Sequence, residues 1–169
     1  MHKNSKYLIN NDPTALVLSG GFSKAAFWHA GVILGLEEAG FHLKKTDKLN
    51  NHKNVISTVV GSSAGAFVGT LIANGYNALD LIESQLPPYK GILPKLKYSD
   101  ILKIHDYGGL TKLSKFLQSK NIKDVLQNFS NTPGLFTTEG LKNYLLDNVI
   151  KENQFSSYDI DFFVVATQL

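Results

Sequence analysis

The stretch Val55–Ala73, with the sequence VISTVVGSSAGAFVGTLIA, decides the fold of this 169-residue chain. Five of its first six residues are apolar or β-branched, which is typical of a buried strand. The run Ala66–Ala73 predicts an apolar helix, and Gly-Ser-Ser-Ala-Gly at 61–65 joins it to the strand. We therefore expect a buried strand over Val55–Val60 that leads through a tight turn directly into a helix.

The same order of strand, glycine turn and helix occurs once before. Thr14–Ser19 is a short apolar run that ends in Gly20-Gly21, and Lys24–Ala39 carries apolar residues at helical spacing before Gly40. Two such units in succession are typical of an α/β fold with a parallel sheet. The sequence thus predicts an α/β protein in which both glycine turns follow the carboxyl ends of strands.

The rest of the chain contains further predicted elements. We expect a polar N-terminal segment at 1–13, a polar connection at 41–53, a short helix at 79–86, a helix at 137–149 and a third buried strand at 160–166. The lysine-rich middle, residues 89–133, shows short amphipathic patterns and predicts a helical insertion or cap without sheet. Residues 14–169 would then form the N-terminal portion of one α/β domain.

Composition narrows the classes of function. The chain has no cysteine, which excludes disulfides, thiolate metal sites and cysteine nucleophiles. All 17 basic residues are lysine, and the lack of arginine argues against a nucleic-acid partner. No apolar signal segment is present in the first 12 residues, so we expect a cytoplasmic protein. The lysines between 44 and 53 predict a solvated loop, with a membrane surface as the alternative partner; the sequence carries no signal for an oligomeric state.

The turn at 61–65 matches G-x-S-x-G, with Ser63 as the candidate nucleophile between Gly61 and Gly65. A serine on a sharp turn from strand to helix is lifted out of the sheet, and small neighbours let the strand and the helix approach each other. The N-terminus of the helix also favours developing negative charge. Ser62 is the neighbouring alternative, but no glycine stands two residues to either side of it.

Two other interpretations of the glycines are open to test. The uncharged stretch Val55–Leu79, with Gly61, Gly65 and Gly69 spaced four apart, resembles a transmembrane helix with a small-residue face, although its centre is polar. A dinucleotide-binding loop counted from Gly20 would need glycine at positions 22 and 25, where the chain has phenylalanine and alanine. No G-K-[ST] occurs, which excludes a P-loop.

Acyl transfer requires an oxyanion hole as well as a nucleophile, and the first glycine turn, at Gly20-Gly21, is a candidate for it. The tetrahedral intermediate needs backbone N–H donors aimed at its oxyanion, and glycines permit the backbone angles that turn consecutive N–H groups into one concavity. The candidate donors are the backbone amides of Gly20, Gly21 and Phe22.

These motifs together resemble the start of the patatin-like phospholipases. That family opens with G-G-G-x-[RK]-G and continues, some tens of residues later, with G-x-S-x-G. Gly20, Gly21 and Lys24 match the opening motif, whereas Phe22 and Ala25 stand where glycines are usual. The sequences at 29–32, 134–138 and 163–167 also resemble segments of these domains.

The resemblance implies a three-layer α/β hydrolase that cleaves lipid esters, of the phospholipase A type, through a Ser–Asp dyad. It implies no catalytic histidine, no metal and no organic cofactor, with a lipid or other ester as substrate. The family's aspartate lies in a D-G-[GA] motif, and this chain has no Asp-Gly dipeptide. We therefore expect the aspartate beyond Leu169, a domain truncated after its third predicted strand, and no activity from residues 1–169 alone.

An alternative function is that of a non-catalytic α/β pseudoenzyme or regulatory binding domain, which the departures at Phe22 and Ala25 favour. We expect His29 to be a partly buried structural histidine, with a general base as the alternative. We expect core packing for Phe22, Phe27 and Trp28, with the lining of an acyl site as the alternative.

Overall fold

The computed structural model describes residues 14–43, 54–97, 103–104 and 136–166. They belong to two compact units, of which the first comprises Met1–Lys95 with Asn148–Leu169 and the second Leu96–Asp147. The first unit contains both glycine turns. The predicted N-terminal segment at 1–13 and most of the predicted insertion at 89–133 lie outside the described residues.

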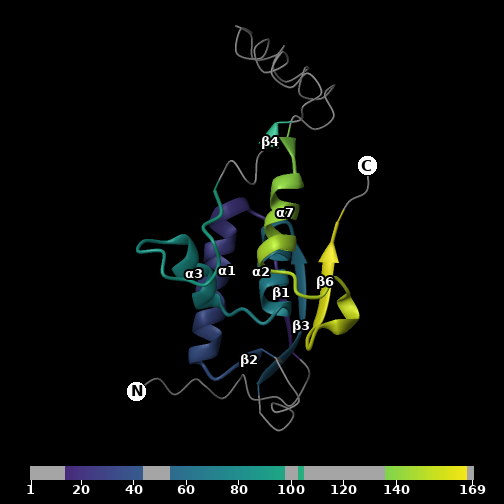
Figure 1. Ribbon diagram of the computed structural model, residues 1–169. Helices are drawn as coiled ribbons and strands as arrows, with labels where there is room; N and C mark the ends of the chain where they lie inside the picture. The colour runs from purple at the N-terminus through teal and green to yellow at the C-terminus, as the bar shows by residue number, and fades with distance from the viewer. Residues whose placement is uncertain (1–13, 44–53, 98–102, 105–135, 167–169) are drawn as a thin grey trace, which may run out of the picture. The chain divides into compact units, whose positions relative to one another are not determined.

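The first unit is built on a parallel sheet with β3 (Val55–Ser62) at its centre. Strand β1 (Thr14–Leu18) pairs with one edge of β3, β6 (Asp161–Val165) pairs with it over Thr58–Ser62, and β2 (His42–Leu43) pairs with its first two residues. The arrows of β3 and β6 point the same way in Figure 1. The parallel α/β fold is confirmed, and the strands end at a common edge.

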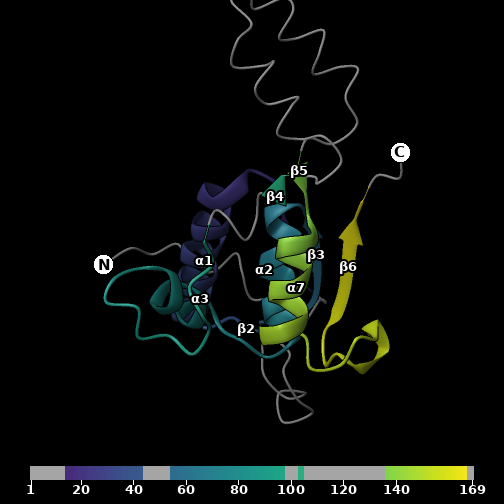
Figure 2. The same cartoon turned by 45° about the horizontal axis from the view of Figure 1, so that its top comes forward.

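Three helices accompany this sheet: α1 (Phe22–Glu38), α2 (Ala64–Ala73) and α3 (Ala78–Gln85). Helix α2 packs against β1, β3 and β6, and α1 packs against both α2 and α3. Figure 2 shows α2 between α1 and β3. Ile33, Val59 and Leu71 are almost fully buried, so the core lies between these helices and one face of the sheet.

Glycine lets α2 approach the sheet closely. A Cβ added to Gly69 would lie 2.5 Å from a ring atom of Phe162, the buried residue of β6. Gly61 thus lies in β3 and faces α2, whereas Gly65 and Gly69 lie in α2 and face strands. The transmembrane interpretation is wrong, because Val55–Leu79 consists of a strand followed by helices, and no helix in the described part of the chain is long and apolar enough to cross a membrane.

The apolar runs at 14–19 and 160–166 predict buried strands, but β1 and β6 are only partly buried. Val17, Val60 and Phe163 share one row across the sheet, because Val17 pairs with Val60 and Val60 pairs with Phe163. The neighbouring residues Val59 and Phe162 are buried, so this row lies on the opposite face. Val17 and Phe163 are 71% and 58% exposed there, which limits the burial of these strands to one face.

The structure also corrects two connections. The predicted polar connection at 41–53 contains β2, because Phe41 and Leu43 are buried beside the start of β3. The second unit contains β4 (Lys103–Ile104), which pairs antiparallel with β5 (Phe136–Thr137), so the prediction of no sheet at 89–133 is wrong at β4. Helix α7 (Glu139–Asn148) confirms the helix expected at 137–149, except that Thr137 belongs to β5.

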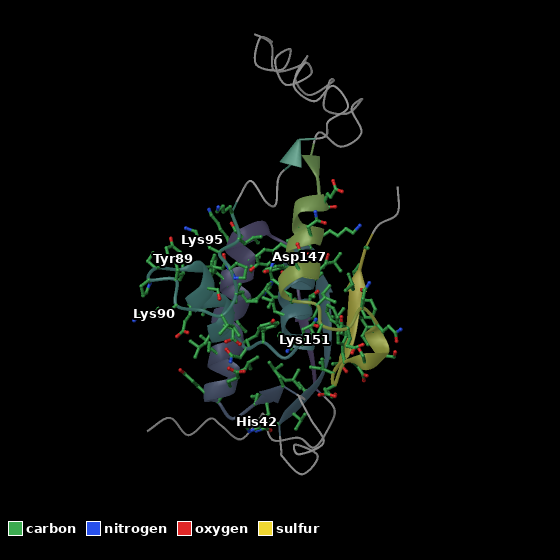
Figure 3. All side chains as sticks on the ribbon, in the orientation of Figure 1. His42, Tyr89, Lys90, Lys95, Asp147 and Lys151 are labelled. Carbon is green, nitrogen blue, oxygen red and sulfur yellow. The ribbon has the colours of Figure 1, made fainter. Side chains whose placement is uncertain are left out.

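The segment after α3 is an ordered loop without a helix over residues 86–97. Figure 3 shows Tyr89, Lys90 and Lys95 together on it. The Lys95 ammonium donates to the Tyr89 hydroxyl at 2.7 Å and lies 4.1 Å from the centre of the same ring. Ser84 fixes the loop to α3, since its buried hydroxyl accepts from Leu93 N–H at 3.0 Å.

Candidate active site

Ser63 is the single residue between the end of β3 and the start of α2. Its backbone angles are φ 52° and ψ −116°, in a region that residues with a Cβ rarely adopt. The side chain is exposed and makes no capping hydrogen bond to the helix. Ser62 belongs to β3, pairs with Val165 and is only half-exposed. Of the two serines, Ser63 therefore has the geometry of a nucleophile elbow.

Gly61 and Gly65, the glycines on either side of Ser63, stand where no larger residue would fit. A Cβ on Gly61 would lie 2.5 Å from the carbonyl oxygen of Gly65, and a Cβ on Gly65 would overlap the carbonyl of Leu18 in β1. No side chain fits at either position without moving backbone. The two glycines thus allow α2 to begin directly against β1 and β3, which holds Ser63 at the common edge of the sheet.

The loop after β1 passes beside Ser63. A Cβ built on Gly20 would lie 3.2 Å from the Cβ of Ser63 and 3.8 Å from its hydroxyl oxygen. Gly21 adopts φ 143° as the residue preceding α1, a conformation that favours glycine. Phe22 is the first residue of α1, so its N–H has no acceptor within the helix. The three residues with the predicted oxyanion donors are thus consecutive, with Gly20 and Gly21 in the loop after β1 and Phe22 at the start of α1, and Gly20 lies next to the serine.

The carbonyl of Ser19 ties this loop to both helices. It accepts a hydrogen bond from the N–H of Gly65 at 3.1 Å. It also lies 2.8 Å from Nε2 of His29, and because a carbonyl can only accept, Nε2 carries the proton. The side chain of His29 is 3% exposed. This contact agrees with the structural role expected for His29, and the sequence did not identify its partner.

The described aromatic side chains of α1 near the loop after β1 differ in their exposure to solvent. Trp28 is 68% exposed, so the prediction of core packing is wrong for this residue, which lies on the outer side of α1. Phe27 is half-buried. The side chain of Phe22 lies outside the described part of the chain.

The described aspartates of the first unit, Asp80, Asp159 and Asp161, lie away from Ser63 or are engaged elsewhere. Asp159 lines a pocket together with Asn74, at the end of α2 that is remote from Ser63. Asp161 pairs with Thr58, whereas Val165 pairs with Ser62, so about 13 Å of strand separates Asp161 from the serine edge. Asp80 caps α3 by accepting from Asn77 N–H at 2.7 Å. No group of three histidine, aspartate or glutamate side chains that could hold a metal occurs within the described ranges.

A pocket of about 290 Å³ lies at the other end of α2. Asn74, the residue after α2, and Lys151 line it, and the Lys151 ammonium donates to the Asn74 carbonyl at 3.3 Å. Figure 3 labels Lys151 in this region. A cation at the C-terminus of a helix complements its dipole, which gives Lys151 a structural role. The ten residues of α2, about 15 Å, separate this pocket from Ser63.

A family model described as Patatin-like phospholipase matches residues 16–168. The chain belongs to the patatin-like phospholipase family. Comparisons with curated proteins and with solved structures gave no match. The family match covers both glycine turns and all described strands except the first two residues of β1. It confirms the resemblance drawn from the motifs and makes the protein a member of a family of lipid acyl hydrolases.

The structure accommodates both departures from the opening motif of the patatin-like phospholipases. Phe22 stands in helical conformation, which residues with a Cβ adopt without strain, so a third glycine is not required there. Ala25 faces Gly21, and a Cβ on Gly21 would lie 2.8 Å from the Cβ of Ala25. The methyl group of Ala25 therefore fits because Gly21 has no side chain.

Proposed function

We propose that this patatin-like protein hydrolyses carboxylic esters of lipids, as a phospholipase A or related lipid acyl hydrolase, with Ser63 as its nucleophile. The observation that carries the proposal is the backbone of Ser63, which has φ 52° at the junction of β3 and α2 and presents an exposed hydroxyl. A strained serine between a strand and a helix N-terminus is the arrangement that α/β hydrolases use for nucleophilic attack.

In the proposed reaction, Ser63 Oγ attacks the ester carbonyl carbon while its proton passes to a general base. The tetrahedral intermediate collapses, the bond to the alcohol oxygen breaks and the alcohol leaves with a proton. Water then attacks the acyl–serine ester, which releases the fatty acid and restores the hydroxyl. We assign the base to an aspartate that follows Leu169. The absence of an Asp-Gly dipeptide in this chain and the remote position of Asp161 support that assignment.

Backbone amides of Gly20, Gly21 and Phe22 supply the proposed oxyanion hole. The closeness of Gly20 to Ser63 supports it, as does the start of α1 at Phe22, because the first amides of a helix favour negative charge. The Gly65 N–H is committed to the Ser19 carbonyl, so it is not a donor to substrate. Each such donor contributes about 3 kcal/mol to lowering the barrier.

The proposed chemistry needs no metal or organic cofactor, because the nucleophile, the base and the oxyanion donors all come from protein. The partner is a lipid ester, taken from a membrane surface by a cytoplasmic or peripheral protein. The alternative is a non-catalytic domain, which rests on the two departures from the opening motif. Since both departures fit the loop without backbone strain, the enzyme is the better supported function.

Hydrolysis of a phospholipid and of a soluble p-nitrophenyl ester by the full-length protein tests the proposal. We expect fatty acid release from the first and p-nitrophenol from the second, both lost in Ser63→Ala. Hydrolysis that continues at the wild-type rate in Ser63→Ala would refute the assignment of the nucleophile. A well-folded wild-type protein without any esterase activity would favour the non-catalytic domain.

A further inference from the structure

We propose that His29 is a positioning residue for the loop after β1, which carries the proposed oxyanion donors, and that it acts through the carbonyl of Ser19. This inference rests on the proposed function. His29 lies inside α1, its side chain is 3% exposed, and its Nε2–H donates to the Ser19 carbonyl at 2.8 Å. Ser19 and His29 are ten residues apart, and the contact joins the loop after β1 to the body of the helix that follows it.

The Ser19 carbonyl is fully occupied by two donors. A carbonyl oxygen has two lone pairs, and here one accepts from His29 and the other from Gly65 N–H at 3.1 Å. The donors come from α1 and α2, so the direction of this carbonyl is fixed from both helices. Gly65 belongs to the serine turn, the G-x-S-x-G segment at 61–65. The Ser19 carbonyl oxygen therefore links the two glycine motifs by hydrogen bonds.

The orientation of the carbonyl sets the orientation of an oxyanion donor. Ser19 C=O and Gly20 N–H belong to one planar trans peptide and point to opposite sides of it. With the carbonyl held toward α1 and α2, the N–H of Gly20 must point away from them. A Cβ built on Gly20 would lie 3.8 Å from Ser63 Oγ, so the residue that carries this amide lies beside the reacting hydroxyl.

The loop needs such a constraint because a glycine opposes rotation of the neighbouring peptide only weakly. Glycine populates both signs of φ about equally, so the Ser19–Gly20 peptide could rotate at small cost. A rotated peptide would turn a carbonyl oxygen, in place of an N–H, toward the developing oxyanion. Gly65 provides one hydrogen bond from a backbone amide, and His29 adds a second from a buried side chain that is itself held within α1.

Two substitutions of His29 in the full-length protein separate positioning from packing. His29→Phe keeps a ring of similar volume but has no donor, whereas His29→Gln supplies an amide N–H that reaches to nearly the place of Nε2. With a soluble p-nitrophenyl ester, we expect His29→Phe to lower kcat on the order of tenfold to a hundredfold with KM within about twofold, because a misaligned donor affects only the transition state. His29→Gln should retain kcat within about threefold.

Ser84→Ala is the matched control. It also removes a buried side chain's hydrogen bonds, to Leu93 and Asp80, but in α3 and its loop. We expect a lower melting temperature with unchanged kcat. A His29→Phe variant with wild-type kcat, or a His29→Gln variant as impaired as His29→Phe, would overturn the positioning role.

Reaction with a fluorophosphonate probe separates this inference from the proposed function. Phosphonylation of serine also passes through a negatively charged oxygen, so His29→Phe should label about tenfold or more slowly than wild type. Equal labelling of the two proteins at Ser63 would overturn the inference alone. A wild-type protein that neither labels at Ser63 nor hydrolyses esters would overturn the proposed function, and the role of His29 with it.

Discussion

The backbone N–H of Gly65 donates to the carbonyl of Ser19 at 3.1 Å, and this bond connects the serine turn with the loop after β1. The bond is possible because Gly65 has no side chain, since a Cβ there would overlap the carbonyl of Leu18. The two glycine motifs, far apart in the sequence, are thus parts of one structure at the carboxyl edge of the sheet. Substitutions at Gly65, Gly20 and Phe22 separate the contribution of this structure to stability from its contribution to catalysis.

Gly65→Ala should destabilise the protein severely. The new methyl group has to displace the backbone of β1, so we expect a loss of about 3 kcal/mol or more in the free energy of unfolding, or failure to fold. Urea denaturation followed by circular dichroism measures it. Gly31→Ala is the matched control, because nothing lies within 4 Å of a Cβ at Gly31 on α1. It should stabilise the protein by up to about 1 kcal/mol, and a similar loss in both variants would contradict the packing described for Gly65.

Gly20→Ala should lower activity more than stability. Gly20 is not among the residues with positive φ, so alanine fits its backbone, but the methyl group would crowd the Cβ of Ser63 at 3.2 Å. We expect a change of less than about 1 kcal/mol in unfolding free energy and ester hydrolysis slower by about tenfold or more. Gly35→Ala, in open space on α1, should leave hydrolysis unchanged. Full activity in Gly20→Ala would contradict the expectation that the loop at Gly20 affects the reaction of Ser63.

Phe22 should act through its backbone alone. Phe22→Pro removes the N–H at the first position of α1, where proline is tolerated, so stability should change little while kcat falls on the order of a hundredfold. Phe22→Gly keeps the N–H and should keep or raise kcat. Initial rates on a soluble ester, with melting temperatures recorded in parallel, distinguish the two variants. Equal activity in Phe22→Pro and wild type would place the oxyanion hole elsewhere.

The sequence predicts the parts of the fold that local patterns determine. An apolar run before each glycine turn and an apolar helix after it are enough to locate β1, β3, α1 and α2, with boundaries within two residues. Strand β3 extends through Gly61, which pairs with both β1 and β6, and Ser62, which pairs with β6, and only the assembled sheet shows these pairings. The two-residue strands β2 and β4 have no periodicity to recognise, and their pairing depends on residues distant in the chain.

In the candidate site, too, the sequence predicts the features that a local motif determines and misses the contacts between distant residues. G-x-S-x-G predicts Ser63 as the candidate nucleophile, and the motif is visible in the sequence because the turn needs glycine at both Gly61 and Gly65. The bond from His29 to Ser19 leaves none, because its acceptor is a backbone carbonyl that any residue could provide. The exposure of Trp28 was also not predictable, since an aromatic residue at one position of a helix packs or not according to the elements that the fold brings beside it.

The proposed function depends above all on Ser63 as the nucleophile, and site-specific labelling tests this assignment most directly. The full-length protein, its Ser63→Ala variant and its Ser62→Ala variant are incubated with a fluorophosphonate probe, and the modified residue is located by peptide mass spectrometry. We expect a single adduct on Ser63 in wild type, an adduct of comparable yield in Ser62→Ala, and none in Ser63→Ala. Labelling that persists in Ser63→Ala and disappears in Ser62→Ala would contradict the assignment and give the reaction to the neighbouring serine.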